Sequence, residues 1–227
     1  MKVIETKKLT KTYDELKVPV HALKAVDLDI HEGEFTAIVG PSGSGKSTLL
    51  NLIGGLDVPT SGSVLINGVE IRTLSENKLI EFRLNNIGFV FQSYNLIPVL
   101  TAKENVEFIM LLKDRPKSQR DQRAKQLLEA VGLGDRMNSR PAELSGGQQQ
   151  RVAVARALAS KPKFILADEP TANLDSEAAI NLLEMMLQLN KEENITFIFS
   201  THDNRVVQRA RRVVTLKDGA IASDESK

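Results

Sequence analysis

The segment that most constrains the fold of this sequence is residues 40–47, GPSGSGKS. It fits the pattern G-x-x-x-x-G-K-[ST] at every fixed position. Residues 35–39 before it form an apolar run of strand type, and residues 48–53 after it carry apolar side chains at helical spacing. A glycine loop in this context predicts backbone N–H groups wrapped around a polyphosphate at the positive end of a helix. An ordinary glycine turn is the alternative, and the agreement of pattern and context disfavours it.

Two side chains of this phosphate loop (residues 40–47) have expected chemical roles. Lys46 is expected to reach the β- and γ-phosphates of a nucleotide, and the Ser47 hydroxyl is expected to bind Mg²⁺. The glycines have no Cβ that would block the approach of the phosphates.

Composition is that of an ordinary globular protein and excludes several classes. Hydrophobic residues make up 41% of the chain, and 30 Lys and Arg oppose 29 Asp and Glu. This balance gives no electrostatic reason to expect a nucleic acid partner. There is no cysteine, and no apolar run approaches the ~20 residues of a membrane-spanning helix. Without a signal-peptide core, the sequence predicts a cytoplasmic protein that needs another chain to span a membrane.

The pattern along the chain predicts an α/β fold. Residues 1–39 have strand-type patterns, and Asn67-Gly68 between two apolar runs is a strong hairpin signal, so an antiparallel β layer is expected beside the phosphate loop. Residues 104–112 and 123–131 have helical spacing, with a solvated loop or helix start between them.

We therefore predict a P-loop NTPase core with a mostly parallel sheet, in one domain over residues 1–227. The core and its antiparallel β subdomain take residues 1–92 and 163–227. A helical subdomain is inserted as residues 93–162.

A second glycine-rich segment, residues 144–148 (LSGGQ), marks a helix start. Ser145 and Gln148 have the spacing of a capping box. Gly146 and Gly147 cost helix stability, roughly 1 kcal/mol each relative to alanine. A phosphate that approaches this helix start closely would explain them, and an ordinary cap is the alternative.

An apolar strand ends in two acids, Asp168 and Glu169. Adjacent carboxylates there are costly to desolvate unless they serve a cation or a reaction. In a phosphate-loop protein, Asp168 is the expected Mg²⁺ partner, and Glu169 is placed to act as general base on the attacking water. A solvated loop pair is the alternative.

Three further residues carry weaker signals. Gln92 and His202 each follow a buried strand, where α/β sheets place ligands, although Gln92 is hard to distinguish from a loop residue. Tyr13 is expected in the first loop, where its ring could stack on adenine, but a lone loop tyrosine is common. The arginines near residue 209 are read as a solvated helix face: Arg205, Arg209, Arg211 and Arg212.

Taken in order along essentially the whole chain, these segments resemble the nucleotide-binding subunit of an ABC transporter. The signature segment (residues 144–148) downstream of a phosphate loop is highly specific to that family. The resemblance implies ATP and Mg²⁺ as cofactors, Tyr13 as the adenine-stacking aromatic, Gln92 as a sensor of Mg²⁺ and water, and His202 as the switch histidine. It also implies that residues 171–175 communicate between two sites. The residues expected at the nucleotide are Tyr13, Gly40, Ser42, Gly43, Ser44, Gly45, Lys46, Ser47, Thr48, Ser145, Gly146, Gly147 and Gln148.

The resemblance also implies partners. Two copies close head to tail around two ATP molecules, so that the signature segment of one copy meets the γ-phosphate held by Lys46 of the other. Closure then drives an integral membrane permease from the cytoplasmic face of the membrane. The surface around Gln92 and the helical subdomain is expected to receive that partner.

A narrower resemblance rests on residues 39–51, 55–62 and 94–106. They look like the subgroup that serves lipoprotein release, macrolide efflux and antimicrobial-peptide resistance, which implies export or extraction. The related cell-division ATPase, which transmits force without moving cargo, is the alternative. Ala172 departs from the subgroup, which often has glycine there. ABC ATPases of translation or DNA repair usually have two cassettes or a long coiled coil, which 227 residues do not accommodate.

Overall fold

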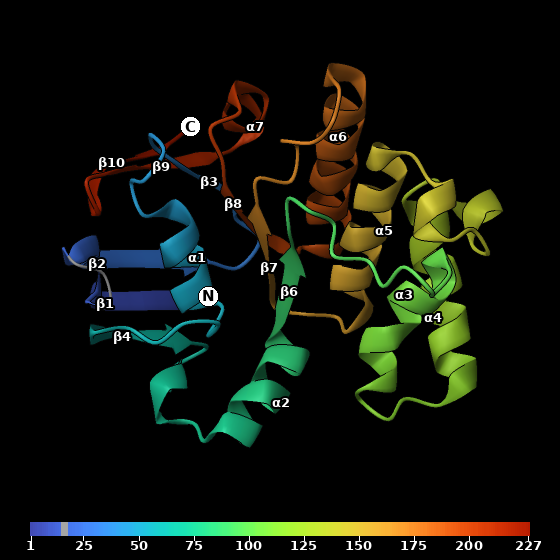
Figure 1. The fold of residues 1–227 in the computed structure, drawn as a ribbon, viewed down its shortest axis with the longest axis horizontal. Helices are drawn as coiled ribbons and strands as arrows, with labels where there is room; N and C mark the ends of the chain where they lie inside the picture. Colours follow the sequence, from blue (N-terminus) through green and yellow to red (C-terminus); the bar gives the residue numbers. More distant parts are fainter. Residues whose placement is uncertain (15–17) are drawn as a thin grey trace.

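The computed structural model describes residues 1–14 and 18–227, and it contains two β-sheets and a group of helices on one side of them (Figure 1). Part of the expected β region, residues 15–17, lies outside the described residues.

The smaller sheet is antiparallel throughout and has the strand order β2-β1-β4-β5. Its strands are β1 (Lys2–Tyr13), β2 (Val20–His31), β4 (Ser61–Ile66) and β5 (Val69–Glu70). Asn67 and Gly68 connect β4 and β5 with φ angles of 49° and 78°. Both values are positive, as the hairpin prediction requires.

The larger sheet has six strands in the order β10-β9-β3-β8-β7-β6. They are β3 (Phe35–Val39), β6 (Ile87–Val90), β7 (Phe164–Asp168), β8 (Thr196–Ser200), β9 (Arg212–Lys217) and β10 (Ala220–Ser226). All neighbours are parallel except β9 and β10. The carboxyl ends of β3, β6, β7 and β8 therefore meet at one edge of the sheet, which is where such sheets bind ligands.

Seven α-helices and three short 3₁₀ helices complete the described part of the chain. The α-helices are α1 (Lys46–Ile53), α2 (Glu76–Asn86), α3 (Ala102–Leu111), α4 (Lys117–Ala130), α5 (Gly146–Ala159), α6 (Ser176–Glu193) and α7 (Asn204–Arg209). The 3₁₀ helices are η1 (Ile71–Thr73), η2 (Gly134–Arg136) and η3 (Pro141–Glu143).

The core lies on both faces of the six-stranded sheet. Ile38, Leu166 and Ile198 point into one apolar cluster, which α1 and the antiparallel sheet complete. Their chain neighbours, such as Ala37 and Phe199, point into a second cluster formed with α3, α4, α5 and α6. Because these strands are buried on both faces, their sequences are continuous apolar runs, and such runs predict buried strands.

Three expectations about elements were wrong or incomplete. Tyr13 is the last residue of β1 and pairs with Val20, so it does not lie in a loop before the first strand. The helix predicted over residues 123–131 begins earlier, at Lys117, so the segment before it contains a helix start, which was one of its two predicted alternatives, with Pro116 at the N-cap position of α4. α2 was not predicted, since none of its residues is buried and its apolar spacing is weak.

The reading of the four arginines as a solvated helix face was also wrong. Only Arg205 and Arg209 belong to α7. Arg212 lies in β9, where it forms ion pairs with Glu34 at 3.0 Å and Asp224 at 2.7 Å. This pairing joins distant segments and leaves no local sequence signal.

Candidate functional site

The phosphate loop connects the end of β3 to α1 and has three glycines at positive φ: Gly40, Gly43 and Gly45. A Cβ at Gly40 would lie 2.2 Å from the Leu216 carbonyl oxygen, and one at Gly45 would lie 2.4 Å from that of Ala22. A Cβ at Gly43 would meet no atom within 4 Å. Gly40 and Gly45 thus allow the loop to pack closely against the backbone at Leu216 and Ala22. Gly43 lies on the open side of the loop, where an anion can approach.

Two polar side chains of this loop, those of Ser44 and Lys46, are buried. The Lys46 ammonium donates to the carbonyl oxygens of Gly40 at 2.9 Å and Pro41 at 3.1 Å. The Ser44 hydroxyl is buried with no partner among the described residues. A nearly buried ammonium and an unpartnered hydroxyl suit a polyphosphate ligand, which supplies acceptors for both.

The start of α1 and the end of β7 are joined by a hydrogen bond between side chains. The Ser47 hydroxyl donates to Asp168 Oδ1 at 3.1 Å. Both are hard oxygen ligands of the kind Mg²⁺ prefers. Within residues 1–14 and 18–227, no group of three or more His, Cys, Asp or Glu side chains is placed to hold a metal ion.

Glu169 follows β7 with φ at 46°, a left-handed conformation that turns the chain sharply after the strand. Its carboxylate is held at both oxygens. His202 Nδ1 lies 2.7 Å from Oε1, and the Thr201 hydroxyl donates to Oε2 at 3.2 Å. The Glu169 side chain is 16% exposed and that of His202 is 74% exposed. A largely buried carboxylate and an exposed imidazole thus lie side by side at the edge of the sheet.

A second carboxylate, that of Asp203, supports this region. It accepts from the Thr171 hydroxyl at 2.7 Å and from the Arg205 backbone N–H at 2.8 Å. Burial alone would raise the pKa of Asp203, but the hydrogen bonds from Arg205 and Thr171 outweigh it and lower the pKa to about 2. Asp203 therefore stays ionised and joins the segment after β7 to the segment after β8.

Gln92 lies two residues beyond β6 and is exposed. Its carbonyl oxygen accepts from the Asn173 side chain at 3.0 Å, and the Tyr94 hydroxyl donates to the Asn173 carbonyl at 3.4 Å. These contacts hold the segment after β6 against residues 171–175. Tyr94 was not among the residues assigned to the site from the sequence, and Asn173 was included only in the communicating segment, residues 171–175.

Tyr13 is fixed from two sides. Its hydroxyl donates to Asp57 Oδ2 at 2.8 Å, and the Lys11 ammonium lies 4.7 Å from the ring centre and 2.6 Å from Asp57 Oδ1. Burial and Asp57 raise the pKa of Tyr13, and the Thr48 hydroxyl acts in the opposite direction. Tyr13 thus lies beside the start of α1, and no local sequence pattern indicates that Asp57 and Lys11 orient it.

The signature segment has the predicted capping box. Gln148 N donates to Ser145 Oγ at 3.3 Å, and Ser145 N donates to Gln148 Oε1 at 2.9 Å. The two glycines allow close packing within the chain: a Cβ at Gly146 would lie 2.8 Å from the Tyr94 hydroxyl oxygen, and one at Gly147 would lie 3.1 Å from the Ala178 Cβ.

The structure brings together most of the predicted residues, but not all. Figure 1 shows α1 on one side of the six-stranded sheet and α5 on the other, with the strands between them. The signature segment at the start of α5 therefore lies away from the phosphate loop of the same molecule.

This arrangement has known relatives. Residues 23–172 match the ABC transporter family. The chain belongs to the ABC transporter family. An uncharacterized ABC transporter ATP-binding protein from Thermotoga maritima is 51% identical over 224 residues, which cover 99% of this cassette and 95% of that protein. The macrolide export ATP-binding/permease protein MacB from Aggregatibacter actinomycetemcomitans is 49% identical over the whole cassette, which spans only 35% of that longer protein.

A solved structure gives the same result. The ATP-binding cassette MJ0796 from Methanocaldococcus jannaschii is 46% identical in sequence to this chain. The two structures align with a TM-score of 0.90 over 98% of each chain. That structure is dimeric, in a post-hydrolysis state bound to ADP and Pi.

The predicted ABC ATPase fold is therefore confirmed, and this cassette is an ATP-binding, ATP-hydrolysing member of the family. Among the described residues, no helix is both long and apolar enough to cross a bilayer.

Proposed function

We propose that two copies of this cassette close head to tail around two ATP molecules and drive an integral membrane permease. The observation that carries the proposal is the separation of α1 and α5 on opposite sides of the sheet. A site that needs the phosphate loop and the signature segment cannot be assembled in one copy. The dimeric state of the MJ0796 structure supports the same reading.

In each site, the phosphate loop binds the polyphosphate and Lys46 neutralises the charge of the β- and γ-phosphates. Tyr13 stacks on the base and Thr48 lies at the phosphates, together with Gly40, Ser42, Gly43, Ser44 and Gly45. Ser47 and Asp168 would hold Mg²⁺, with Gln92 as its sensor. When bound, Mg²⁺ supplies charge that stabilises the transferring phosphoryl group.

Glu169 is the proposed general base. Its carboxylate takes a proton from the attacking water, while Thr201 fixes Oε2 and His202 orients the opposite oxygen. Ser145, Gly146, Gly147 and Gln148 of the second copy complete the site at the γ-phosphate with a helix N-terminus. Hydrolysis removes the group that both copies hold, so the pair reopens.

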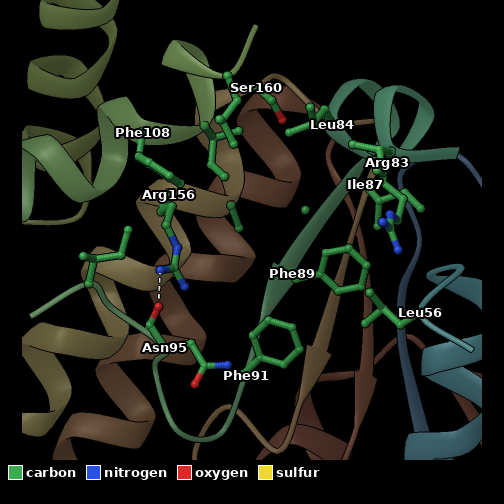
Figure 2. Close-up of a pocket in the computed structure, with 16 residues that line it drawn as sticks. Leu56, Arg83, Leu84, Ile87, Phe89, Phe91, Asn95, Phe108, Arg156 and Ser160 are labelled. Atoms are coloured by element: carbon green, nitrogen blue, oxygen red, sulfur yellow. Dashed lines mark hydrogen bonds between the residues drawn. The ribbon is translucent and has the colours of Figure 1, made fainter. Parts of the chain in front are cut away.

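The permease partner has a suitable docking groove on this cassette. A cavity of ≈440 Å³ lies between α2, β6, α3 and α5 (Figure 2). Its walls include the stacked rings of Phe89 and Phe91 and the exposed side chains of Ile80 and Leu112. Arg156 spans the groove floor and donates to the carbonyl oxygens of Tyr94 and Asn95. Because Tyr94 also contacts Asn173, an element docked here acts on the segment that carries Gln92.

A short apolar helix of the permease is the proposed occupant of this groove. The groove is largely apolar, and the MacB relative joins a cassette and a permease in one chain. The proposed location is then the cytoplasmic face of the membrane, and the proposed cargo is a lipoprotein, peptide or drug that is exported or extracted. The division into a core (1–92 and 163–227) and a helical subdomain (93–162) fits this role, since the groove lies between them.

The chemical part of the proposal is tested with Glu169→Gln. Loss of the base is expected to lower the ATPase rate about 100-fold or more, with ATP affinity within about twofold of the wild type. Glu129→Gln is the matched control, because Glu129 is an exposed carboxylate of α4, which Figure 1 shows across the six-stranded sheet from α1. A Glu169→Gln variant with a wild-type rate would remove Glu169 from the base role.

The transport part is tested by recovering the tagged cassette at native level from solubilised membranes. An integral partner with a few spans and a large extracytoplasmic domain is the expected result. A partner tied to cell-wall hydrolases would favour the force-transmitting alternative, and recovery without any membrane protein would contradict the permease proposal.

A further inference from the structure

A second cavity of ≈380 Å³ lies beside the turn between α3 and α4 and is unusually cationic. Its lining contains Lys113, Arg115, Arg123 and Lys161, three glutamines of α4, and no carboxylate. The whole chain has a net charge of only +1, so this concentration of positive charge is local.

These cations have few counter-ions. Among the described residues, only Arg123 has a carboxylate within ion-pair distance, Glu193 at 3.7 Å. Burial lowers the pKa of Lys113, and the charge of Arg115 lowers it further, so two like charges are held together. The Arg123 Nε–H is buried without an acceptor among the described residues. An anion in the cavity would relieve both features.

Helix capping explains part of this cluster, but not all of it. Lys113 donates to the Ser160 carbonyl at 3.3 Å and Arg123 donates to that of Leu158 at 3.4 Å, so both stabilise the end of α5. Arg115 and Lys161 are exposed and make no such side-chain contact among the described residues. The acidic side chain of Asp114, in the same turn, does not line the cavity.

Two exposed leucines lie next to these cations in the chain. Leu111 is 49% exposed and Leu112 is 51% exposed, at the end of α3. Figure 1 shows this turn at the lower edge of the molecule. Ser160 lines both the cationic cavity and the apolar groove, so the two features are adjacent. Apolar side chains flanked by Lys and Arg are typical of surfaces that lie on an anionic bilayer.

We propose that this lipid-binding tip, Leu111 and residues 113–116 together with Arg123 and Lys161, binds the phosphate headgroups of anionic membrane lipids, with Leu111 entering the interface. The cassette would then contact the bilayer directly, in addition to its permease. This contact is separate from the docking groove, and either can fail while the other stands.

The test is co-sedimentation of the purified cassette with vesicles of phosphatidylglycerol and phosphatidylcholine, compared with vesicles of phosphatidylcholine alone. Binding to the anionic vesicles only, lost at 0.5 M salt, is the expected result. The double variant Arg115→Ser/Lys161→Ser should lower the partition coefficient about 25-fold, since each cation near an anionic surface contributes about fivefold. Leu111→Ser should lower it separately.

Lys24→Ser/Lys191→Ser is the matched control, because it removes two exposed cations elsewhere and should bind nearly as the wild type does. Equal binding by both double variants would overturn the proposal, as would no binding to anionic vesicles. Inorganic phosphate at millimolar concentration distinguishes a lipid site from a site for free phosphate. It should leave vesicle binding unchanged, and release of the protein by phosphate would also overturn the proposal.

Discussion

At the scale of single residues, the site depends on side chains that fix other side chains. Thr201 and His202 hold both oxygens of Glu169. Asp57 fixes the Tyr13 side chain in the same way, because it accepts hydrogen bonds from both the Tyr13 hydroxyl and the Lys11 ammonium. A ring held in this way loses less conformational entropy when a base stacks on it.

Asp57→Asn is therefore expected to weaken ATP binding about three- to tenfold and to leave kcat within about twofold, since charged hydrogen bonds are the strong ones. Two constants are measured for the wild type and the variant: the Kd for ATP, and the inhibition constant of tripolyphosphate, which has no base that could stack on Tyr13. Tripolyphosphate binding should be unchanged. Equal weakening of both ligands would show that Asp57 supports the phosphate loop instead of Tyr13.

The residue scale also shows what the sequence could and could not predict. The phosphate loop, Asp168 and Glu169 lie in short segments whose strand and helix context is local, so the pattern alone predicted the strands and the helix beside them. Asp57 lies 44 residues from Tyr13, and nothing local marks the contact between them. The arginines of residues 205–212 were misread for the same reason, because the partners of Arg212 lie on other strands.

At the scale of elements, α3 anchors the segment that follows Gln92. Asn105 is fully buried and accepts from the Ile97 N–H at 2.8 Å. Its amide group also donates to the carbonyl oxygens of Ile97, Leu100 and Thr101. One side chain thus satisfies the backbone of a segment that has no regular structure of its own.

Asn105→Leu is expected to destabilise the fold by about 3 kcal/mol, because several buried backbone groups lose their partner. Urea denaturation measures the change. Asn85→Leu on α2 is the control, since among the described residues the exposed Asn85 amide donates only to the Glu81 carbonyl oxygen of its own helix, and it should change stability by about 0.5 kcal/mol or less. Equal effects of both substitutions would contradict the anchoring role.

At the scale of the whole molecule, stability should depend on pH because several carboxylates have lower pKa values in the folded state than in the unfolded state. The pKa of Asp203 falls from 3.8 to about 2, and those of Glu34 and Asp224 are also lowered. A carboxylate whose pKa is lower in the folded state stabilises the fold fully when the pH is above its pKa in the unfolded state. This stabilisation is lost as the pH falls through its pKa in the folded state.

The melting temperature should therefore be flat from pH 7 to about 5 and fall steeply between about pH 4 and pH 2. Asp203→Asn should lower the melting temperature at pH 7 and reduce the slope in the acid range. If the melting temperature of Asp203→Asn fell with pH as steeply as that of the wild type, Asp203 would not contribute to this acid sensitivity.

The central claim is that two copies share each ATP site, and the most direct measurement is the mass of Glu169→Gln in solution by light scattering. With ATP and Mg²⁺, it should double from the 25.0 kDa of one chain, and it should remain at 25.0 kDa without nucleotide. Adding Ser145→Arg should abolish the dimer, because a bulky side chain would enter the shared site. A Glu169→Gln protein that binds ATP and stays at 25.0 kDa, or a dimer indifferent to Ser145, would contradict the account.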